Sequence, residues 1–320
     1  MTRPSTGRMN WESAYHAPVL AREVAELLGN ARHVLDGTLG GGGHALALLE
    51  GGAHVVGLDR DPQAVREAVQ RLAPFVSSGA LSIHCGNYAD LDALPALAAQ
   101  HFDAILLDLG VSSHQLDDEA RGFTFRPGAV LDMRMGEDAT ASAAEFLNAA
   151  PESELAWVFR EYGDERRAPR LAREVTRRRA NRPFATSDDF VGAIRAVLGA
   201  TSGASDFARL FQAVRIAIND ELSGLERALP VLRDHLLPGG TLAVIAYHSG
   251  EDRLVKHAFR EWSTACTCPP RQPMCTCRGV AMGTLRTRRA ITAAADEVAA
   301  NPRARSARLR AWQRAWQRAA

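Results

Sequence analysis

The chain has 320 residues, of which 46% are hydrophobic and 23% are charged. This is the size of one large domain or two ordinary ones, and the composition excludes a disordered or collagen-like protein. No run of 18 apolar residues occurs, and the segment from Met1 to Trp11 lacks the apolar stretch of a signal peptide. We therefore expect a cytoplasmic protein without a membrane contact.

The net charge is +1, but it is unevenly distributed along the chain. Residues 278–320 contain ten Arg against Asp296 and Glu297, a local charge of +8, which leaves about −7 for the first 277 residues. Clustered positive charge attracts polyanions. The C-terminal segment is therefore a candidate nucleic-acid contact.

The first regular pattern is an apolar strand, a glycine-rich loop and a helical stretch. His33–Asp36 is the predicted strand, and residues 37–43 include five glycines before the apolar stretch Ala45–Leu49. A second strand follows at Ala53–Asp59, and Asp61-Pro62 is a typical helix start.

Further strands are predicted at Leu81–His84, Phe102–Asp108 and Thr241–Tyr247. Strands that alternate with helices indicate an α/β fold with a doubly wound parallel sheet. About 130 residues separate the last two strands, although a crossover needs only a dozen or more. An inserted subdomain is therefore expected.

The insertion, predicted at 116–201, has helical spacing throughout. The predicted domains are thus 1–115, 116–201 and 202–320. Its helices are expected at Pro151–Tyr162, Arg166–Arg179 and Ser187–Leu198, and an apolar stripe follows at Phe207, Leu210, Phe211, Val214 and Ile218. Residues 160–182 contain nine Arg against four acids. This stretch is either a solvated helix face or an RNA-phosphate contact.

The glycine loop and Asp59 together match a nucleotide-binding pattern. The loop lies between a predicted strand and helix, and Asp59 follows Gly40 by 19 residues at the end of the next strand. Glycines let the backbone approach a ligand, and the acid can accept hydrogen bonds from ribose hydroxyls. The pattern does not decide which adenosyl cofactor is bound. Asp108 ends the fourth strand, where a dehydrogenase needs no acid.

An ordered series of motifs resembles the bacterial ribosomal RNA small-subunit methyltransferase H family, also called MraW. The motifs are His16-Ala17-Pro18-Val19-Leu20, Asp36-Gly37-Thr38, Gly42-Gly43-His44, Asp59-Arg60-Asp61-Pro62, Asp108-Leu109-Gly110-Val111-Ser112-Ser113, Gln115-Leu116-Asp117, Arg121-Gly122-Phe123, Leu131-Asp132-Met133-Arg134-Met135, Phe211-Gln212-Ala213-Val214-Arg215, His248-Ser249, Glu251-Asp252-Arg253 and Asn301-Pro302-Arg303-Ala304-Arg305-Ser306.

The resemblance implies a class I, Rossmann-like methyltransferase sheet with an inserted helical, RNA-recognising domain. It also implies methyl transfer from S-adenosylmethionine to the exocyclic N4 of a cytosine in the decoding centre of 16S ribosomal RNA. The expected partner is 16S ribosomal RNA or the small ribosomal subunit. The sequence does not decide between a monomer and a homodimer.

The resemblance assigns the cofactor contacts residue by residue. Gly42, Gly43 and His44 are placed near the methionine and ribose, Asp59 at the ribose hydroxyls and Tyr88 against the adenine, and the set is completed by Asp108 and Gln115. The alternatives are that Tyr88 is an ordinary half-buried aromatic residue and that His44 is a solvent-facing residue at a helix start.

Two positions depart from the family pattern. Gly41 stands where the family often has Arg, and Gly250 replaces an apolar residue. Cofactor binding should survive the first change because the backbone amides remain, whereas the second removes a packing contact.

Asp108 is the expected catalytic residue. The exocyclic amine of cytosine is a poor nucleophile because its lone pair is delocalised into the ring, so the site must orient the amine and accept a proton. The carbonyls of Leu109 and Gly110 are further acceptors. Tyr247 and His248 either line the base pocket or serve the fold.

Four cysteines, Cys266, Cys268, Cys275 and Cys277, lie within twelve residues. They are either ligands of one Zn²⁺ or a reducible or merely structural cluster. The one-residue spacing within each pair favours the second alternative, because paired zinc ligands usually have two or more residues between them. Methyl transfer needs no metal, so no catalytic metal is expected.

Other classes share parts of this pattern. A small-molecule or protein methyltransferase needs no Arg-rich surfaces, and a non-catalytic RNA-binding module needs no cofactor loop. The closest alternative is an amino-methyltransferase that acts on DNA, at cytosine N4 or adenine N6.

Overall fold

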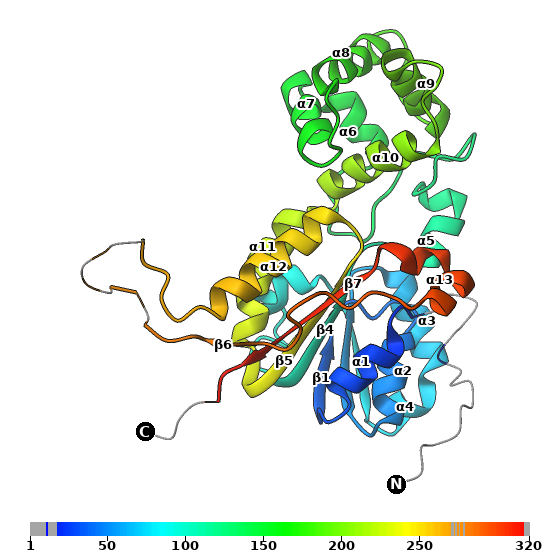
Figure 1. The fold of residues 1–320 in the computed structure, drawn as a ribbon. Coiled ribbons are helices and arrows are strands. Elements are labelled where there is room, and N and C mark those ends of the chain that lie inside the picture. The colour runs from blue at the N-terminus through cyan, green and yellow to red at the C-terminus, as the bar shows by residue number, and fades with distance from the viewer. Residues whose placement is uncertain are drawn as a thin grey trace. The chain divides into compact units, whose positions relative to one another are not determined.

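The computed structural model describes Trp11, residues 18–269, Gln272, Met274, Thr276, Cys277 and residues 279–316. His16, Ala17 and Cys275 of the sequence analysis lie outside the described residues. The chain forms two compact units, of which unit 1 comprises Met1–Gly110 and Ala228–Ala320, and unit 2 comprises Val111–Arg227. Figure 1 shows the fold from the N-terminus in blue to the C-terminus in red.

Unit 1 contains a seven-stranded sheet in the order β3-β2-β1-β4-β5-β7-β6. Strands β1 to β5 are parallel, and β7 pairs antiparallel with β5 and with β6. The strands are β1 (His33–Asp36), β2 (His54–Asp59), β3 (Leu81–Cys85), β4 (Phe102–Asp108), β5 (Leu236–Ala246), β6 (Gly283–Leu285) and β7 (Arg308–Arg314). The predicted doubly wound parallel sheet is confirmed.

The central strands consist almost entirely of apolar residues. Five of the seven residues of β4 are buried, four of them consecutive, Ala104 to Leu107. Successive side chains of a strand point to opposite faces, so this burial requires cover on both faces of the sheet. The parallel register brings the carboxyl ends of β1, β2 and β4 to one edge, where each strand ends in an aspartate.

The helices of unit 1 are set by local start signals. Asp61 caps one of them, because its Oδ1 accepts the amide N–H of Gln63 at 2.9 Å while Pro62 takes the first helical position. They are α1 (Ala21–Leu28), α2 (Gly43–Glu50), α3 (Pro62–Arg71), α4 (Ala73–Ser77), η1 (Tyr88–Ala93), α12 (Ser249–Trp262), α13 (Ala295–Ala300) and η3 (Pro302–Ser306). Helix α11 (Glu221–Asp234) runs through the boundary of the two units. Within the described part of the chain, no helix has the length and apolar character to cross a bilayer.

Unit 2 is entirely helical apart from turns and one isolated bridge, between Val130 and Thr186. Its elements are α5 (Ser113–Asp117), η2 (Glu119–Arg121), α6 (Ala143–Ala149), α7 (Glu152–Glu161), α8 (Ala168–Arg179), α9 (Ser187–Leu198) and α10 (Ala204–Ile218). Capping boxes start three of them, at Ser112, Ser142 and Thr186.

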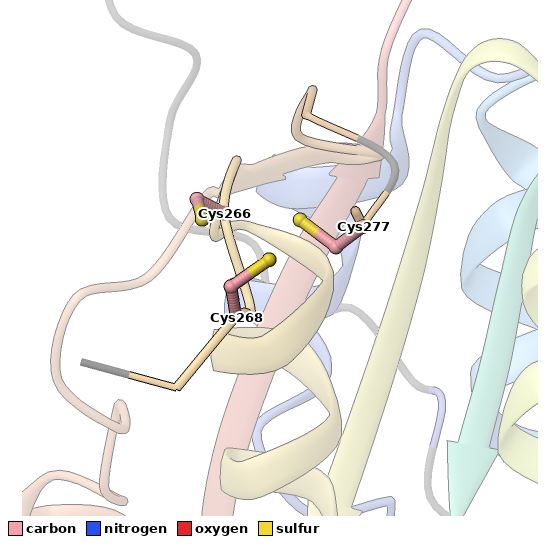
Figure 2. Close-up of side chains that lie close together, drawn as sticks. All are labelled: Cys266, Cys268 and Cys277. Carbon is pink, nitrogen blue, oxygen red and sulfur yellow. The ribbon is translucent and has the colours of Figure 1, made fainter. Parts of the chain in front are cut away.

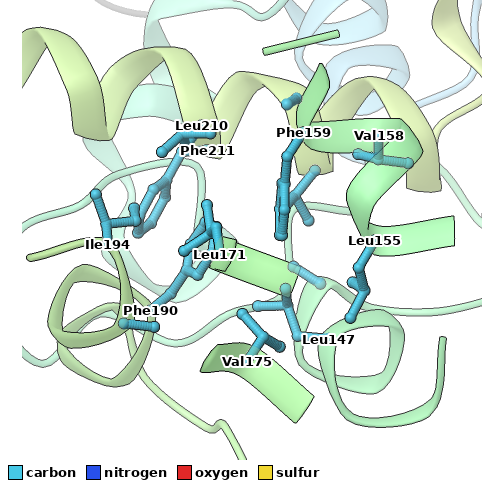
Figure 3. Packing of buried hydrophobic residues seen from close by; sticks show 14 of the residues in the cluster. Leu147, Leu155, Val158, Phe159, Leu171, Val175, Phe190, Ile194, Leu210 and Phe211 are labelled. Atoms are coloured by element: carbon cyan, nitrogen blue, oxygen red, sulfur yellow. The ribbon is translucent and has the colours of Figure 1, made fainter. Parts of the chain in front are cut away.

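The core of unit 2 determines where the unit ends. Leu171, Phe190 and Phe211, from three different helices, pack into one buried cluster (Figure 3). Phe211 belongs to α10, which the sequence analysis placed after the insertion 116–201. Because the apolar stripe of α10 is buried in this core, unit 2 extends to Arg227.

Strand β7 is inserted between β5 and β6 near the end of the chain. Its side chains alternate, so that Leu309 and Ala311 are buried while Arg308 is exposed. Trp312 is fully buried, and its ring meets Trp262 of α12 at 5.2 Å between ring centroids. The basic C-terminal segment therefore contributes a core strand as well as surface charge.

Candidate active site

The carboxyl edge of the parallel sheet gathers acidic and aromatic side chains. Asp36 ends β1, Asp59 ends β2 and Asp108 ends β4, while Tyr88 follows β3 and Tyr247 follows β5. The strand order reverses between β1 and β4. Open α/β sheets bind their ligands outside the carboxyl ends of the strands at this reversal.

Asp108 is held by contacts from three elements. Its Oδ1 accepts a hydrogen bond from the hydroxyl of Tyr247 at 2.8 Å, and its Oδ2 lies 3.3 Å from Nε2 of His44. Its amide donates to Oγ1 of Thr38 at 2.6 Å. The side chain is only 9% exposed, so the carboxylate is oriented by its neighbours rather than by solvent.

His44 lies in the first turn of α2 and is buried. Burial acts to lower the pKa of His44, but the nearby carboxylates of Asp108 and Asp36 outweigh it, so the pKa is raised. Burial also raises the pKa of Asp36 to about 7, against a lowering by His44. The ionisation of His44 and that of Asp36 are therefore coupled.

Three polar atoms of this cluster are buried and make no hydrogen bond to the described residues. They are Oδ2 of Asp36 and both ring nitrogens of His44, of which Nε2 lies 3.3 Å from Oδ2 of Asp108. Leaving such atoms unpaired costs about 1–3 kcal/mol each. A polar ligand that offers both donors and acceptors at this edge would satisfy them.

Asp59 links the end of β2 to the glycine loop. Its Oδ2 accepts the amide N–H of Gly40 at 2.7 Å, and its Oδ1 accepts that of Asp61 at 2.9 Å. Burial raises the pKa of Asp59 to about 6, although these two amides lower it. Each carboxylate oxygen retains a lone pair, so the group can still accept from a diol.

The glycines predicted to contact a cofactor are also required by the fold. Gly42 has φ 73°, and a Cβ there would lie 2.6 Å from Cδ1 of Leu72. A Cβ on Gly43 would lie 2.9 Å from Cγ of Pro18. A side chain at either position would therefore require its neighbour to shift, before any ligand is considered.

The remaining predicted residues lie in different surroundings. Tyr88 is half-buried at the start of η1, and its Cβ lies 3.4 Å from the position that a Cβ on Gly37 would take. His248 caps α12, with its Nε2 3.2 Å from Glu251 of the same turn. Gln115 belongs to unit 2, where its Oε1 accepts the amide of Ser112 at 2.9 Å and completes the capping box of α5.

Two residues near the acidic cluster were not singled out from the sequence. Thr38 was quoted only within a motif, yet it fixes the backbone of Asp108. Glu297 was counted only as an acid of the basic tail, yet its Oε1 accepts the amide of Leu20 at 2.7 Å and its charge acts on His44. Burial raises the pKa of Glu297. Its position in α13 depends on tertiary packing, for which no local pattern gives a signal.

The arginines of the basic C-terminal segment fall into two groups: some bind other parts of the fold, and others are exposed. Arg310 forms a bidentate ion pair with Asp252, at 2.7 and 3.0 Å, and its side chain is only 13% exposed. Arg314 donates to the carbonyl oxygen of Asp234 at 2.9 Å. Arg305 and Arg308, in contrast, are exposed.

The Arg-rich stretch 160–182 likewise contains both arginines that bind other residues and arginines that are exposed. Arg179 donates to the carbonyl oxygens of Leu147 and Ala150, and both Arg177 and Arg178 bind Glu174. The contacts of Arg179 join α8 to the end of α6, whereas the pairs with Glu174 lie within α8 itself. Exposed arginines of the stretch include Arg160, Arg166 and Arg170.

The fold and the acid-lined edge define a Rossmann-like methyltransferase of class I, as expected from the strand order, the glycine loop and the acid at the end of β4. The chain belongs to the MraW methylase family, whose model matches residues 13–315. Its cofactor is S-adenosylmethionine, as the sequence analysis predicted.

Curated relatives agree with this membership over nearly the whole chain. A ribosomal RNA small subunit methyltransferase H from Gemmatimonas aurantiaca is 61% identical, covering 94% of this chain and 96% of the relative. One from Heliobacterium mobile is 44% identical, covering 94% and 99%.

Solved structures are more distant. An rRNA methylase from Streptococcus thermophilus gives a TM-score of 0.40 at 12% identity, covering 92% of this chain and 93% of that one. The N-methyltransferase NodS from Bradyrhizobium japonicum gives 0.41 at 9% identity, covering 92% of each. Scores of this size do not establish a shared activity.

Proposed function

We propose that the protein transfers a methyl group from S-adenosylmethionine to the exocyclic N4 of a cytosine in the decoding centre of 16S ribosomal RNA. The observation that carries the proposal is the carboxylate of Asp108, which Tyr247 and His44 hold at the end of β4. The name of the relatives, ribosomal RNA small subunit methyltransferase, supports the substrate class.

The acidic edge fits the cofactor electrostatically. S-adenosylmethionine supplies the methyl group on a positively charged sulfonium. Asp36, Asp59 and Asp108 place three carboxyl groups at this edge, and the buried Oδ2 of Asp36 is an acceptor that still lacks a partner. Acceptors in a site of low exposure favour a cationic ligand.

Individual residues are proposed to hold different parts of the cofactor. Asp59 accepts the ribose hydroxyls, and the ring of Tyr88 lies against the adenine. The loop at Gly42 and Gly43 lets the backbone approach the methionine portion, beside His44. Gln115 is proposed to complete the set from α5.

Asp108 is proposed to act on the target amine. Its carboxylate accepts a hydrogen bond from the amine, which orients the nitrogen toward the methyl carbon, and it takes the proton that the amine loses. Tyr247 keeps Oδ1 in place, and His44 beside Oδ2 stabilises the carboxylate until the proton arrives. Tyr247 also closes one side of the space in which the base is held.

Unit 2 and the C-terminal segment are proposed to hold the RNA. Exposed arginines occur in both, among them Arg166, Arg170, Arg305 and Arg308. Arg pairs well with phosphate, and a cytosine in folded RNA must be splayed out before its amine can react.

The experiment that tests this function offers 16S ribosomal RNA, small ribosomal subunits and double-stranded DNA side by side with S-adenosylmethionine. Mass spectrometry of the digested nucleosides should find N4-methylcytidine in the ribosomal RNA and no methylated base in the DNA. Methylation at another atom of cytosine would contradict the proposed N4 target, and methylation of DNA alone would favour the alternative substrate.

Asp108→Asn tests the residue that carries the proposal. Turnover should fall at least 100-fold while RNA affinity stays within about 2-fold, because the change removes a proton acceptor and no surface charge. Asp234→Asn is the control, since the side chain of Asp234 is 60% exposed and its carboxylate pairs with the neighbouring Arg233. Wild-type turnover by Asp108→Asn at saturating cofactor would exclude the proposed role of Asp108.

A further inference from the structure

The segment between α12 and β6 is a long loop, and its described residues form no hydrophobic core. Its ends are joined by a hydrogen bond from the amide of Met282 to the carbonyl oxygen of Trp262, at 2.8 Å. None of the described residues from Ser263 to Met282 is buried, and Met274 and Val280 are 76% and 66% exposed. Apolar packing therefore contributes little to the shape of this segment, and loops of this length usually have another source of order.

Three thiols come together within it. The Sγ atoms of Cys266, Cys268 and Cys277 all lie within 4.8 Å of one another. Figure 2 shows the sulfur atoms of Cys268 and Cys277 pointing toward each other.

These separations suit a shared metal ion. Thiolates bound to Zn²⁺ at ~2.3 Å in tetrahedral geometry have their sulfur atoms ~3.8 Å apart. The observed arrangement thus needs only a small contraction to hold an ion. A disulfide needs a sulfur–sulfur distance of about 2.05 Å, and Cys266 and Cys268 are separated by a single residue.

A backbone donor also points at one of the sulfur atoms. The amide of Thr267, the residue between Cys266 and Cys268, donates to Sγ of Cys277 at 3.3 Å. A donor to sulfur stabilises the thiolate, which is the form that binds metal. This contact also fixes the first cysteine pair against the later cysteine.

We propose that Cys266, Cys268 and Cys277 bind a structural Zn²⁺ that orders the segment between α12 and β6. An all-thiolate set selects soft ions, and Zn²⁺ fits a site without a redox role. Structural zinc sites have four ligands. Cys275 lies outside the described residues, so the proposal assigns only three.

The zinc is independent of methyl transfer. The three cysteines follow the C-terminal end of α12, whereas the acidic cluster lies at the carboxyl ends of the strands. Binding energy from the ion would replace the apolar packing that the segment lacks.

The test begins with the full chain purified under reducing conditions and loaded with Zn²⁺. Elemental analysis after removal of free metal should find about one zinc per chain. The double variant C266S/C268S should lose the zinc. C85S is the matched control, because Cys85 is also exposed but lies in β3, and it should keep the zinc.

A second readout uses Co²⁺ in place of Zn²⁺ on the wild-type chain. Thiolate coordination should give an intense sulfur-to-cobalt charge-transfer band and the visible bands of a tetrahedral site. This measurement decides the question even where the double variant fails to fold. Removal of the metal should speed amide hydrogen exchange at Thr267 several-fold, because that amide donates to Sγ of Cys277.

Two outcomes would overturn the proposal. One is a wild-type chain that binds neither Zn²⁺ nor Co²⁺ while all its thiols titrate as reduced. The other is full zinc content in C266S/C268S.

Discussion

The hydroxyl of Tyr247 donates to Oδ1 of Asp108 across 139 residues of sequence, at 2.8 Å. It joins the end of β5 to the end of β4, which are neighbouring strands of the sheet. Burial raises the pKa of Tyr247 well above its usual value, and Asp108 raises it further. Tyr247 therefore remains a proton donor over the whole working range of pH.

Tyr247→Phe removes this hydrogen bond without removing the ring. Because a hydrogen bond to a charged group is worth about 1.5–3 kcal/mol, turnover should fall roughly 10- to 100-fold at saturating cofactor. Steady-state kinetics with the RNA substrate measure it. Tyr162→Phe, which removes a phenol from unit 2, should leave turnover unchanged. Equal rates for both variants would mean that Asp108 needs no help from Tyr247.

Asp59→Ala should weaken binding of S-adenosylmethionine by about 1.5–3 kcal/mol, through loss of a charged acceptor. The same change also releases the amides of Gly40 and Asp61, so the loop is expected to loosen. Calorimetry gives the affinity, and a thermal melt without cofactor isolates the effect on the loop. An unchanged affinity would remove Asp59 from the site.

Asp36 should make the protein less stable as the pH rises from about 4 to 7. Its usual pKa is 3.8, but its pKa in the folded protein is about 7, so between these values only the folded state keeps the proton. This contribution to stability is complete below about pH 4 and is lost as the pH reaches 7.

Asp36→Asn removes that titration. The slope of the free energy of unfolding against pH should become less negative by up to about 1.4 kcal/mol per pH unit between pH 4 and 7. Urea unfolding at a series of pH values measures the slope, with Asp234→Asn as an exposed control. Parallel curves for Asp36→Asn and wild type would argue against a raised pKa.

Gly42→Ala should lower stability more than Gly52→Ala does. Both glycines have positive φ, 73° and 87°, so both changes incur a similar backbone strain. Only at Gly42 would the new Cβ collide, with Leu72 at 2.6 Å, whereas nothing lies within 4 Å at Gly52. Thermal or urea unfolding should show an extra cost of about 1–3 kcal/mol for Gly42→Ala. Equal losses would show that Leu72 moves aside freely.

Replacing the exposed Arg305 and Arg308 by Gln should flatten the salt dependence of RNA binding. Two lost phosphate contacts correspond to a change of about 1.4–1.8 in the slope of log affinity against log salt concentration. Arg310→Gln is the control, because Arg310 is paired with Asp252 and its loss should lower stability rather than the slope. An unchanged slope for the double variant would direct attention to Arg166 and Arg170.

Much of the sheet was predictable because its central strands contain apolar runs and three of them end in aspartate. β1 and β4 have the predicted bounds, and β2 begins one residue later than predicted. The apolar run of β4 needs no knowledge of its neighbours to be recognised. Asp59 and Asp108 were predictable for the same reason, since each ends such a run.

The contacts around these acids were not predictable. Glu297 of α13 accepts the amide of Leu20 and its charge acts on His44, and Arg310 meets Asp252 because β7 packs against α12. No local periodicity encodes such pairs. The end of unit 2 was misplaced for a related reason, since the stripe of α10 shows that a face is buried but not which core buries it.

Strand β7 has a consequence for synthesis of the protein. The strand occupies the gap between β5 and β6, so one side of β5 gains its backbone partners only from residues 308–314. During translation that side of β5 stays unpaired until residues 308–314 have left the ribosome. Exposed strand edges invite pairing with other chains. A nascent or truncated chain that ends before Arg308 is therefore expected to depend on chaperones and to aggregate.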